Sequence, residues 1–309
     1  MSKEARFFIL LGVVLWTVNP ILGAETQSLR PSLAVPTRIS LGTTPVFRYE
    51  TVNFTIKNAP TAEIAREFGE TAEALRRELA VLWLGQEMPN WPKKCPISVK
   101  VGKHFGASGD TTFTFNHGGV DMVEMNVQGT YERILDSVLP HEISHTIFAH
   151  YFRRPLPRWI DEGAATSVEH ISERSTYRRM LLEFVDPTVR RAIPFNRMVE
   201  MQEYPKDFLP LYSQCNSVAE FLIGQGGNRR FIAFAKDGLD TGDWNAAASK
   251  YYGYDHLGDL QVVWIGWVGD EFPDLASYEP ALLRNRRVQS LRQNLIPKFE
   301  PFEPVVAGL

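Results

Sequence analysis

Hydrophobic and polar residues alternate with a period of two in several segments of the first half of the chain, which indicates strands with one buried face. Four strands are predicted in this half, over 49–56, 97–101, 111–115 and 120–127. The last two are separated by Asn116–Gly119, whose composition favours a hairpin turn. One helix interrupts the strands. It is predicted to open at Pro60–Thr61 and to end at Gly85, because apolar residues recur between them at helical spacing.

After Gly129 the spacing of apolar residues changes from two to about 3.6 and stays helical. Helices are predicted over 131–152, 160–184, 195–201, 211–223, 228–236, 243–252 and 259–268. The first of them should be broken or kinked near Pro140, since proline lacks the N–H that a helix interior needs. Strands with one helix followed by helices alone predict an α+β fold, with a sheet-bearing part over 46–129 and a helical part over 130–268.

The N-terminus is typical of an export signal. Lys3 and Arg6 precede a short apolar run, Phe7–Trp16, and Leu22–Ala24 supplies small residues for cleavage. We therefore predict a signal peptide over 1–24 and an exported protein, whether periplasmic, extracellular or at the cell surface. An uncleaved N-terminal anchor is the alternative, although a span needs about 20 apolar residues.

The mature chain, beyond the signal, contains no further segment that predicts stable membrane insertion. Its first stretch, 25–45, is rich in Ser, Thr, Pro and Gly without periodicity and is predicted to be a linker. The polar, proline-marked stretch 269–309 is predicted to be a C-terminal tail. The remainder, 46–268, is then predicted to be the folded domain.

Charge and cysteine content narrow the class of protein. The formal net charge of the 309 residues is only -3, and the sequence has no concentrated basic stripe, so we do not expect a nucleic-acid partner. The two cysteines, Cys95 and Cys215, are too few for a four-sulfur zinc site. They either pair as a disulfide in an oxidising compartment or are buried separately, and the sequence does not decide between these alternatives.

The segment His141-Glu142-Ile143-Ser144-His145 combines the residues of a metal site with a base. Residues four apart lie on one face of a helix, so His141 and His145 can bind one cation, and neutral imidazole is a good zinc ligand. Glu142 lies one position along, beside the metal, where it can activate a zinc-bound water.

A third ligand is available from Glu162, at the start of the next predicted helix. The first helix extends about 10 Å past His145 if it ends near Phe152. The connection through Pro155 and Pro157 is long enough to bring the chain back beside the histidines. Two histidines and one carboxylate, with a fourth position left for water, are typical of a catalytic zinc site.

Together with Trp159-Ile160-Asp161-Glu162-Gly163-Ala164-Ala165, the histidine segment resembles the gluzincin metallopeptidases, especially peptidase MA-like proteins and the catalytic domain of M1 aminopeptidases. The resemblance implies a zincin-like fold and one Zn²⁺ per chain held by His141, His145 and Glu162. It further implies that Glu142 is the general base and that Glu169, seven residues after the third ligand, orients a zinc histidine.

The resemblance also implies that Tyr212 donates a hydrogen bond to the oxyanion of the tetrahedral intermediate. A tyrosine that only packs in the core would look the same in the sequence. One part of the M1 pattern is missing, because the motif that captures a free amino terminus is absent and Val123–Asn126 only approximates it. That segment is expected to be a strand able to pair with an extended peptide.

We therefore expect an exported zinc metallopeptidase that acts on peptide or protein substrates. Two alternatives are a non-catalytic, zinc-stabilised binding protein on a peptidase scaffold and a zinc hydrolase of non-peptide amides or esters. Glu142 argues against the first of these, because a binding protein needs no base beside its metal. Oligomeric state and side-chain preference are not predicted.

Overall fold

The computed structural model describes residues 5–10, 37–40, 45–116, 119–270 and 272. The chain divides into two compact units, of which the first contains Met1–Leu156 and Ala164–Arg174 and the second contains Pro157–Gly163 and Ser175–Leu309. Most of the predicted signal, linker and tail therefore lies outside the described residues. The predicted division at residue 130 separates strands from helices along the chain and is a different division from that between these units.

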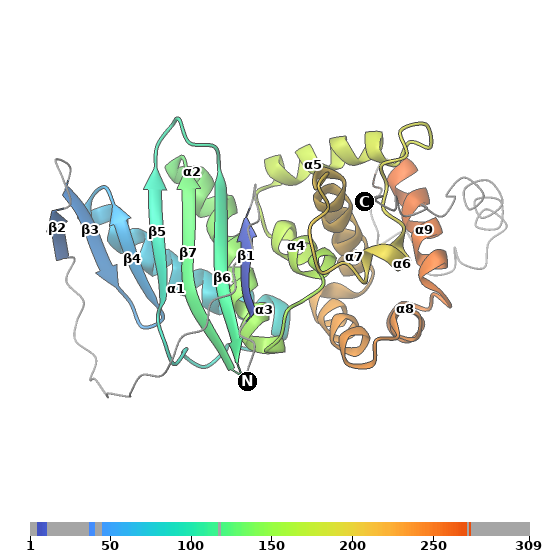
Figure 1. The fold of residues 1–309 in the computed structure, drawn as a ribbon, viewed down its shortest axis with the longest axis horizontal. Helices are drawn as coiled ribbons and strands as arrows, with labels where there is room; N and C mark the ends of the chain where they lie inside the picture. Colours follow the sequence, from blue (N-terminus) through green and yellow to red (C-terminus); the bar gives the residue numbers. More distant parts are fainter. Residues whose placement is uncertain (1–4, 11–36, 41–44, 117–118, 271, 273–309) are drawn as a thin grey trace, which may run out of the picture. The chain divides into compact units, whose positions relative to one another are not determined.

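Unit 1 is built on a mixed sheet (Figure 1). Its strands are β1 (Ala5–Leu10), β2 (Thr37–Ser40), β3 (Pro45–Glu50), β4 (Phe54–Ala59), β5 (Cys95–Val101), β6 (Ser108–Asn116) and β7 (Gly119–Gly129). Their order across the sheet is β1-β6-β7-β5-β4-β3-β2. Strands β4, β5 and β7 run parallel, and β6 pairs antiparallel with β7 on one side and with β1 on the other. The predicted hairpin is confirmed, since Asn116 pairs with Gly119.

Two predictions for the first half were wrong in detail. The single strand 49–56 is two strands, β3 and β4, with a turn between them in which the hydroxyl of Thr51 accepts a hydrogen bond from the Phe54 N–H at 3.0 Å. Part of the predicted linker is the strand β2, which pairs with β3. Backbone pairing with a neighbour needs no alternating hydrophobic pattern, so periodicity did not reveal this strand.

The helices of unit 1 pack on each other and on the sheet. Helix α1 (Ala62–Leu84) begins and ends as predicted, because the Thr61 hydroxyl accepts the Ile64 N–H and Gly85 adopts a left-handed conformation with φ of 78°. Helix α2 (Tyr131–Arg133) continues through a π-helical turn, η1 (Ile134–Val138), into α3 (Leu139–Phe152). The predicted irregularity near Pro140 is thus the π-helical turn η1, which lies directly before α3. Such a turn is expected because proline cannot donate a hydrogen bond to the preceding turn.

Two helices contribute residues to both units. They are α4 (Arg158–Ser167) and α5 (Ile171–Phe184). The sequence predicted one helix over 160–184, but Val168–His170 separates the two. This break changes the surroundings of Glu169, which is not on the helix that carries Glu162.

The rest of unit 2 is helical. Its helices are α6 (Phe195–Met198), α7 (Leu209–Thr241), α8 (Trp244–Tyr252) and α9 (Leu257–Gly269). Helix α7 bends at Gly227, whose φ of 76° and ψ of 166° are not helical, which agrees with the two separate helices predicted there. The aromatic core is centred on Trp159, whose ring packs edge-on against Phe231 and Trp244 at 6.2 and 5.8 Å between ring centroids.

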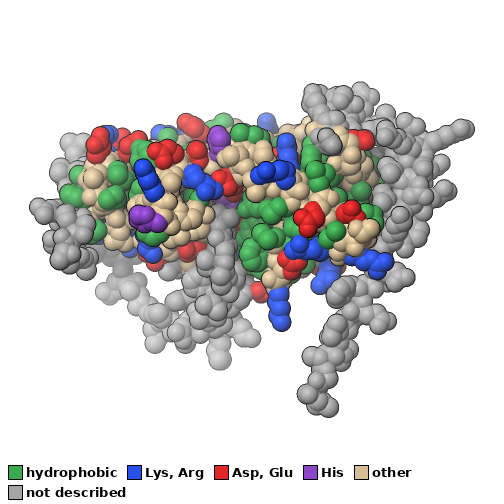
Figure 2. Space-filling model, turned by 90° about the horizontal axis from the view of Figure 1, so that it is seen from above, with side chains coloured by type: hydrophobic (Ala, Val, Ile, Leu, Met, Phe, Trp, Pro, Cys, Tyr) green, Lys and Arg blue, Asp and Glu red, His purple; other side chains and the backbone are tan. Residues whose placement is uncertain are grey.

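The described residues therefore form a mixed sheet with helices, followed by a mostly helical C-terminal part. Among those residues, every helix is too short or too polar to cross a bilayer. On the face drawn in Figure 2, acidic and basic side chains are interspersed and do not form a stripe of one sign.

Candidate metal centre

His141 and His145 lie on the same face of α3 and point to one place. Their rings are 4.7 Å apart between centroids, with an interplanar angle of 75°. Both side chains are buried, at 0% and 1% exposure. A buried pair of imidazoles one helical turn apart is the arrangement that the sequence spacing predicts.

Glu162 joins the two histidines. The candidate ligand atoms of His141, His145 and Glu162 all lie within 4.8 Å of one another, and all three residues are buried. Two imidazoles and a carboxylate are a set of donors whose chemistry suits zinc.

Glu169 contacts the first of these histidines. Its Oε1 lies 2.6 Å from Nδ1 of His141, and its side chain is buried. This contact makes Nδ1 the donor nitrogen and Nε2 the nitrogen that would bind a metal ion. The prediction placed Glu169 on one helix with Glu162, but the carboxylate reaches the ring from the break between α4 and α5.

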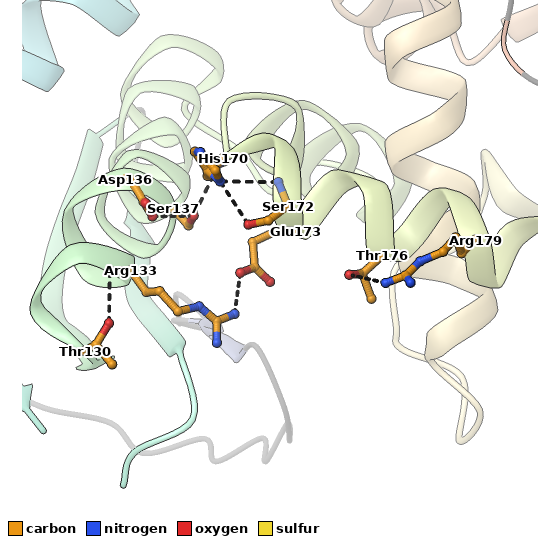
Figure 3. Close-up of polar contacts among 9 residues, drawn as sticks. All are labelled: Thr130, Arg133, Asp136, Ser137, His170, Ser172, Glu173, Thr176 and Arg179. Carbon is orange, nitrogen blue, oxygen red and sulfur yellow. Dashed lines mark hydrogen bonds and ion pairs between the residues drawn. The ribbon is translucent and has the colours of Figure 1, made fainter. Parts of the chain in front are cut away.

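Hydrogen bonds around His170 hold that break in place (Figure 3). The His170 N–H donates to the hydroxyl of Ser137, on η1, at 3.3 Å, and Ser137 donates to Asp136 at 2.7 Å. The ring of His170 accepts the N–H of Ser172 at the start of α5. The residue next to Glu169 is thereby tied to the turn that precedes α3, and its ring caps a helix and does not serve as a ligand.

Glu142 is completely buried and is held by β6. The hydroxyl of Thr111 donates to Oε2 of Glu142 at 2.6 Å. Gly109, two residues earlier on the strand, lies so close that a Cβ there would come 2.5 Å from Oε1 of Glu142. The strand thus fixes the carboxylate from the side of the sheet, and a side chain at position 109 would displace it.

A group of aromatic residues surrounds Glu162 within unit 2. The hydroxyl of Tyr204 donates to Oε1 of Glu162. The ring of Tyr204 stacks on that of Tyr212 at 5.9 Å and 9°, and Tyr177 stacks on the other side of Tyr212 at 6.4 Å and 18°. The guanidinium of Arg158 lies 4.4 Å from the centroid of the Tyr204 ring. Arg158 is itself buried, at 2% exposure.

Burial and the nearby carboxylate of Glu162 keep both phenols protonated. Desolvation raises the pKa of Tyr204 and of Tyr212 far above the usual value, and the negative charge of Glu162 raises both further. The two hydroxyls also interact with each other, which raises the pKa of Tyr212 and lowers that of Tyr204. Tyr204 in turn donates to Glu162.

The structure brings together the residues that the sequence singled out, and it adds three that the sequence did not. Tyr204 lies in a proline-marked loop without periodicity, and Thr111 and Gly109 lie on a strand, so no local pattern identifies them. The expected pairing of Val123–Asn126 with a peptide was wrong, because β7 lies between β5 and β6 and has no open edge.

Cys95 and Cys215 are both free and buried. Burial raises the pKa of each thiol, and the nearby carboxylate of Glu142 adds to this effect at Cys95, as that of Glu162 does at Cys215. Of the two alternatives left open by the sequence, the structure therefore has separate, buried thiols, which are unreactive when neutral.

No protein-family model matches the chain, and no curated protein matches it. The resemblance to gluzincins accordingly depends on the motif residues themselves.

Proposed function

We propose that the protein is an exported zinc metallopeptidase of the gluzincin type, with a zincin-like fold, that hydrolyses peptide bonds. One observation carries the proposal: His141, His145 and Glu162 form a buried group with ligand atoms within 4.8 Å of one another, and the buried carboxylate of Glu142 follows directly after the first ligand. Burial of so many titratable groups costs folding free energy and is typical of a functional site.

His141, His145 and Glu162 would hold the zinc ion, with Glu169 orienting His141. When bound, zinc supplies a Lewis acid that lowers the pKa of a water molecule and polarises the scissile carbonyl. Glu142 accepts a proton from the attacking water molecule while the oxygen of that water forms a bond to the carbonyl carbon. The C–N bond then breaks, and Glu142 returns the proton to the leaving amine.

Tyr212 is the proposed hydrogen-bond donor to the oxyanion. Its high pKa keeps the proton on the phenol, as a donor requires. In the structure the hydroxyl of Tyr212 interacts with that of Tyr204, so donation to a substrate requires Tyr212 to exchange this partner for the oxyanion.

The variant Glu142→Gln tests the proposal. It keeps the shape and the neighbours of the side chain but removes the base, and we expect peptide hydrolysis to fall by about 10²–10⁴-fold while zinc content stays near one ion per chain. The assay is cleavage of a mixed peptide library by the purified chain, with the new termini mapped by mass spectrometry. Glu132→Gln is the control, because it makes the same change on an exposed carboxylate of α2.

Three outcomes distinguish the proposal from its alternatives. Unchanged hydrolysis in Glu142→Gln contradicts the role of the base. A zinc-loaded wild-type chain that cleaves neither peptides nor small amides and esters is a binding protein. A chain that cleaves only the non-peptide amides or esters is a hydrolase of that class.

A further inference from the structure

We propose that Tyr204 is a positioning residue that holds the carboxylate of Glu162 in the orientation needed to bind the metal ion. This inference rests on the proposed zinc site and assigns a role within it to a residue that the motifs do not contain. Its basis is a direct contact, since the Tyr204 hydroxyl donates a hydrogen bond to Oε1 of Glu162.

The hydrogen bond gives the two carboxylate oxygens of Glu162 different roles. Oε1 accepts the proton of Tyr204, which leaves Oε2 as the better donor to a cation. A carboxylate that binds through one oxygen occupies one coordination position, so a four-coordinate zinc ion keeps a position for water. Partners of this kind fix ligand orientation at many metal sites.

Tyr204 is itself fixed in place by two neighbours. The ring of Tyr212 stacks on one face at 5.9 Å, and the guanidinium of Arg158 lies 4.4 Å from the ring centroid. Arg158 is anchored by a hydrogen bond of 3.1 Å from Nε to the carbonyl of Gln202. Arg158 also lies one helical turn before Glu162 on α4, so the helix that carries the ligand carries one support of Tyr204 as well.

The hydroxyl of Tyr204 is oriented as a donor toward Glu162. Nη1 of Arg158 donates to the phenol oxygen at 3.4 Å, which leaves the phenol proton for Oε1 of Glu162. A rigid aromatic side chain loses little conformational entropy when it is ordered, unlike a flexible amide or lysine.

The test is the zinc affinity of the full chain with Tyr204→Phe, measured by competition with a chromophoric chelator. Phenylalanine keeps the ring stack and removes only the hydroxyl, and we expect zinc to bind about 10–100-fold more weakly. The absorption spectrum of the chain loaded with Co²⁺ in place of zinc should also change, because its intensity depends on coordination number. The unfolding temperature of the metal-free variant should stay close to that of the wild type.

Two other variants separate positioning from general damage. Tyr252→Phe removes a hydroxyl from a buried tyrosine of unit 2 and should leave zinc affinity unchanged. Tyr212→Phe keeps the contact between Tyr204 and Glu162, so it should lower kcat and leave zinc affinity within about threefold, as one neutral hydrogen bond removed from a neighbour would.

A double-mutant cycle gives the sharpest result. In a Glu162→His background, three imidazoles still make a zinc site but offer no carboxylate to Tyr204. Adding Tyr204→Phe should then have little effect on zinc affinity, whereas loss by general damage would be the same in both backgrounds.

Several results would overturn the inference. They are an unchanged zinc affinity and Co²⁺ spectrum in Tyr204→Phe, an equal loss in Tyr252→Phe, or an equal loss in both backgrounds of the cycle. A wild-type chain that binds zinc through Glu162 but hydrolyses no substrate would reject the peptidase proposal alone. A wild-type chain that binds no zinc would reject both.

Discussion

Helices α3 and α4 supply the proposed metal ligands in different ways. On α3, the spacing of His141 and His145 alone places both rings on one face, and polar side chains then hold the site, with Thr111 on the base and Glu169 on a ligand. On α4, a single proposed ligand, Glu162, accepts a hydrogen bond from the half-buried phenol of Tyr204, which lies in an aromatic stack. Short-range geometry sets the first half of the site, whereas tertiary packing sets the second.

This difference predicts that substitutions on the two sides of the site have different effects. Loss of a polar partner on the α3 side should change the chemistry of the site and leave the fold intact, because each partner makes one hydrogen bond. Changes of packing on the α4 side should affect stability as well, since the residues of α4 next to Glu162 also pack in the core of unit 2, whereas loss of the Tyr204 hydroxyl alone should not.

Among the variants that test this comparison, the largest effect is expected for Glu169→Gln, a change on the α3 side. The amide cannot accept the His141 N–H as a charged carboxylate does, so zinc should bind about 10–100-fold more weakly, measured by chelator competition. Glu173→Gln is the control. It makes the same change on a nearby glutamate of α5, whose partner is Arg133. If the two variants bind zinc equally well, Glu169 has no role in orienting the ligand.

The next effect concerns Gly163, directly after the ligand on α4. A Cβ at this position would overlap the carbonyl of Cys215 on α7 and lie 3.1 Å from Cβ of Ala219, so α4 and α7 can approach this closely only at a glycine. Gly163→Ala should lower the free energy of unfolding by about 1–3 kcal/mol, measured by urea denaturation of the metal-free chain.

Gly258→Ala is the matched control for that prediction. A Cβ at position 258, in the first turn of α9, meets no atom within 4 Å. This variant should be as stable as the wild type or slightly more stable, since alanine favours a helix over glycine. A Gly163→Ala variant of unchanged stability would show that the packing of α4 on α7 is looser than the structure has it.

The comparison also explains how much of the site the sequence could predict. The two histidines of α3, the proposed base Glu142 and the third proposed ligand all belong to local motifs, and the structure brings His141, His145 and Glu162 together. The α+β order and the caps of α1 were likewise predictable, because they depend on local spacing and on single residues such as Thr61 and Gly85.

The residues that support the site, Thr111 and Tyr204, were not predictable, because each contacts a residue far away in the sequence. Thr111 and Glu142 are 31 residues apart, and Tyr204 and Glu162 are 42 apart. The residues around Thr111 resemble those of any strand, and the residues around Tyr204 resemble those of any loop. The break before α5 was missed for a related reason, since the hydrogen bond from His170 to Ser137 that holds it is tertiary.

The smallest effect is expected for Thr111→Val, on the α3 side. Valine has nearly the shape of threonine but cannot donate to Oε2 of Glu142, so the base loses one hydrogen bond while the strand keeps its pairing with β7 through Met125. One charge-assisted hydrogen bond contributes about 1.5–3 kcal/mol at most, and water can replace part of it, so kcat should fall about tenfold.

Zinc affinity should not change in this variant, because Thr111 contacts the base and not a ligand. Thr112→Val, the same substitution one residue along, points to the opposite face of the sheet and should leave kcat unchanged. A fall in zinc affinity that accompanies the fall in kcat would mean that β6 supports the ligands as well as the base. The polar partners of α3 would then act as one unit, and the contrast with the packed surroundings of Glu162 would be weaker than the contacts indicate.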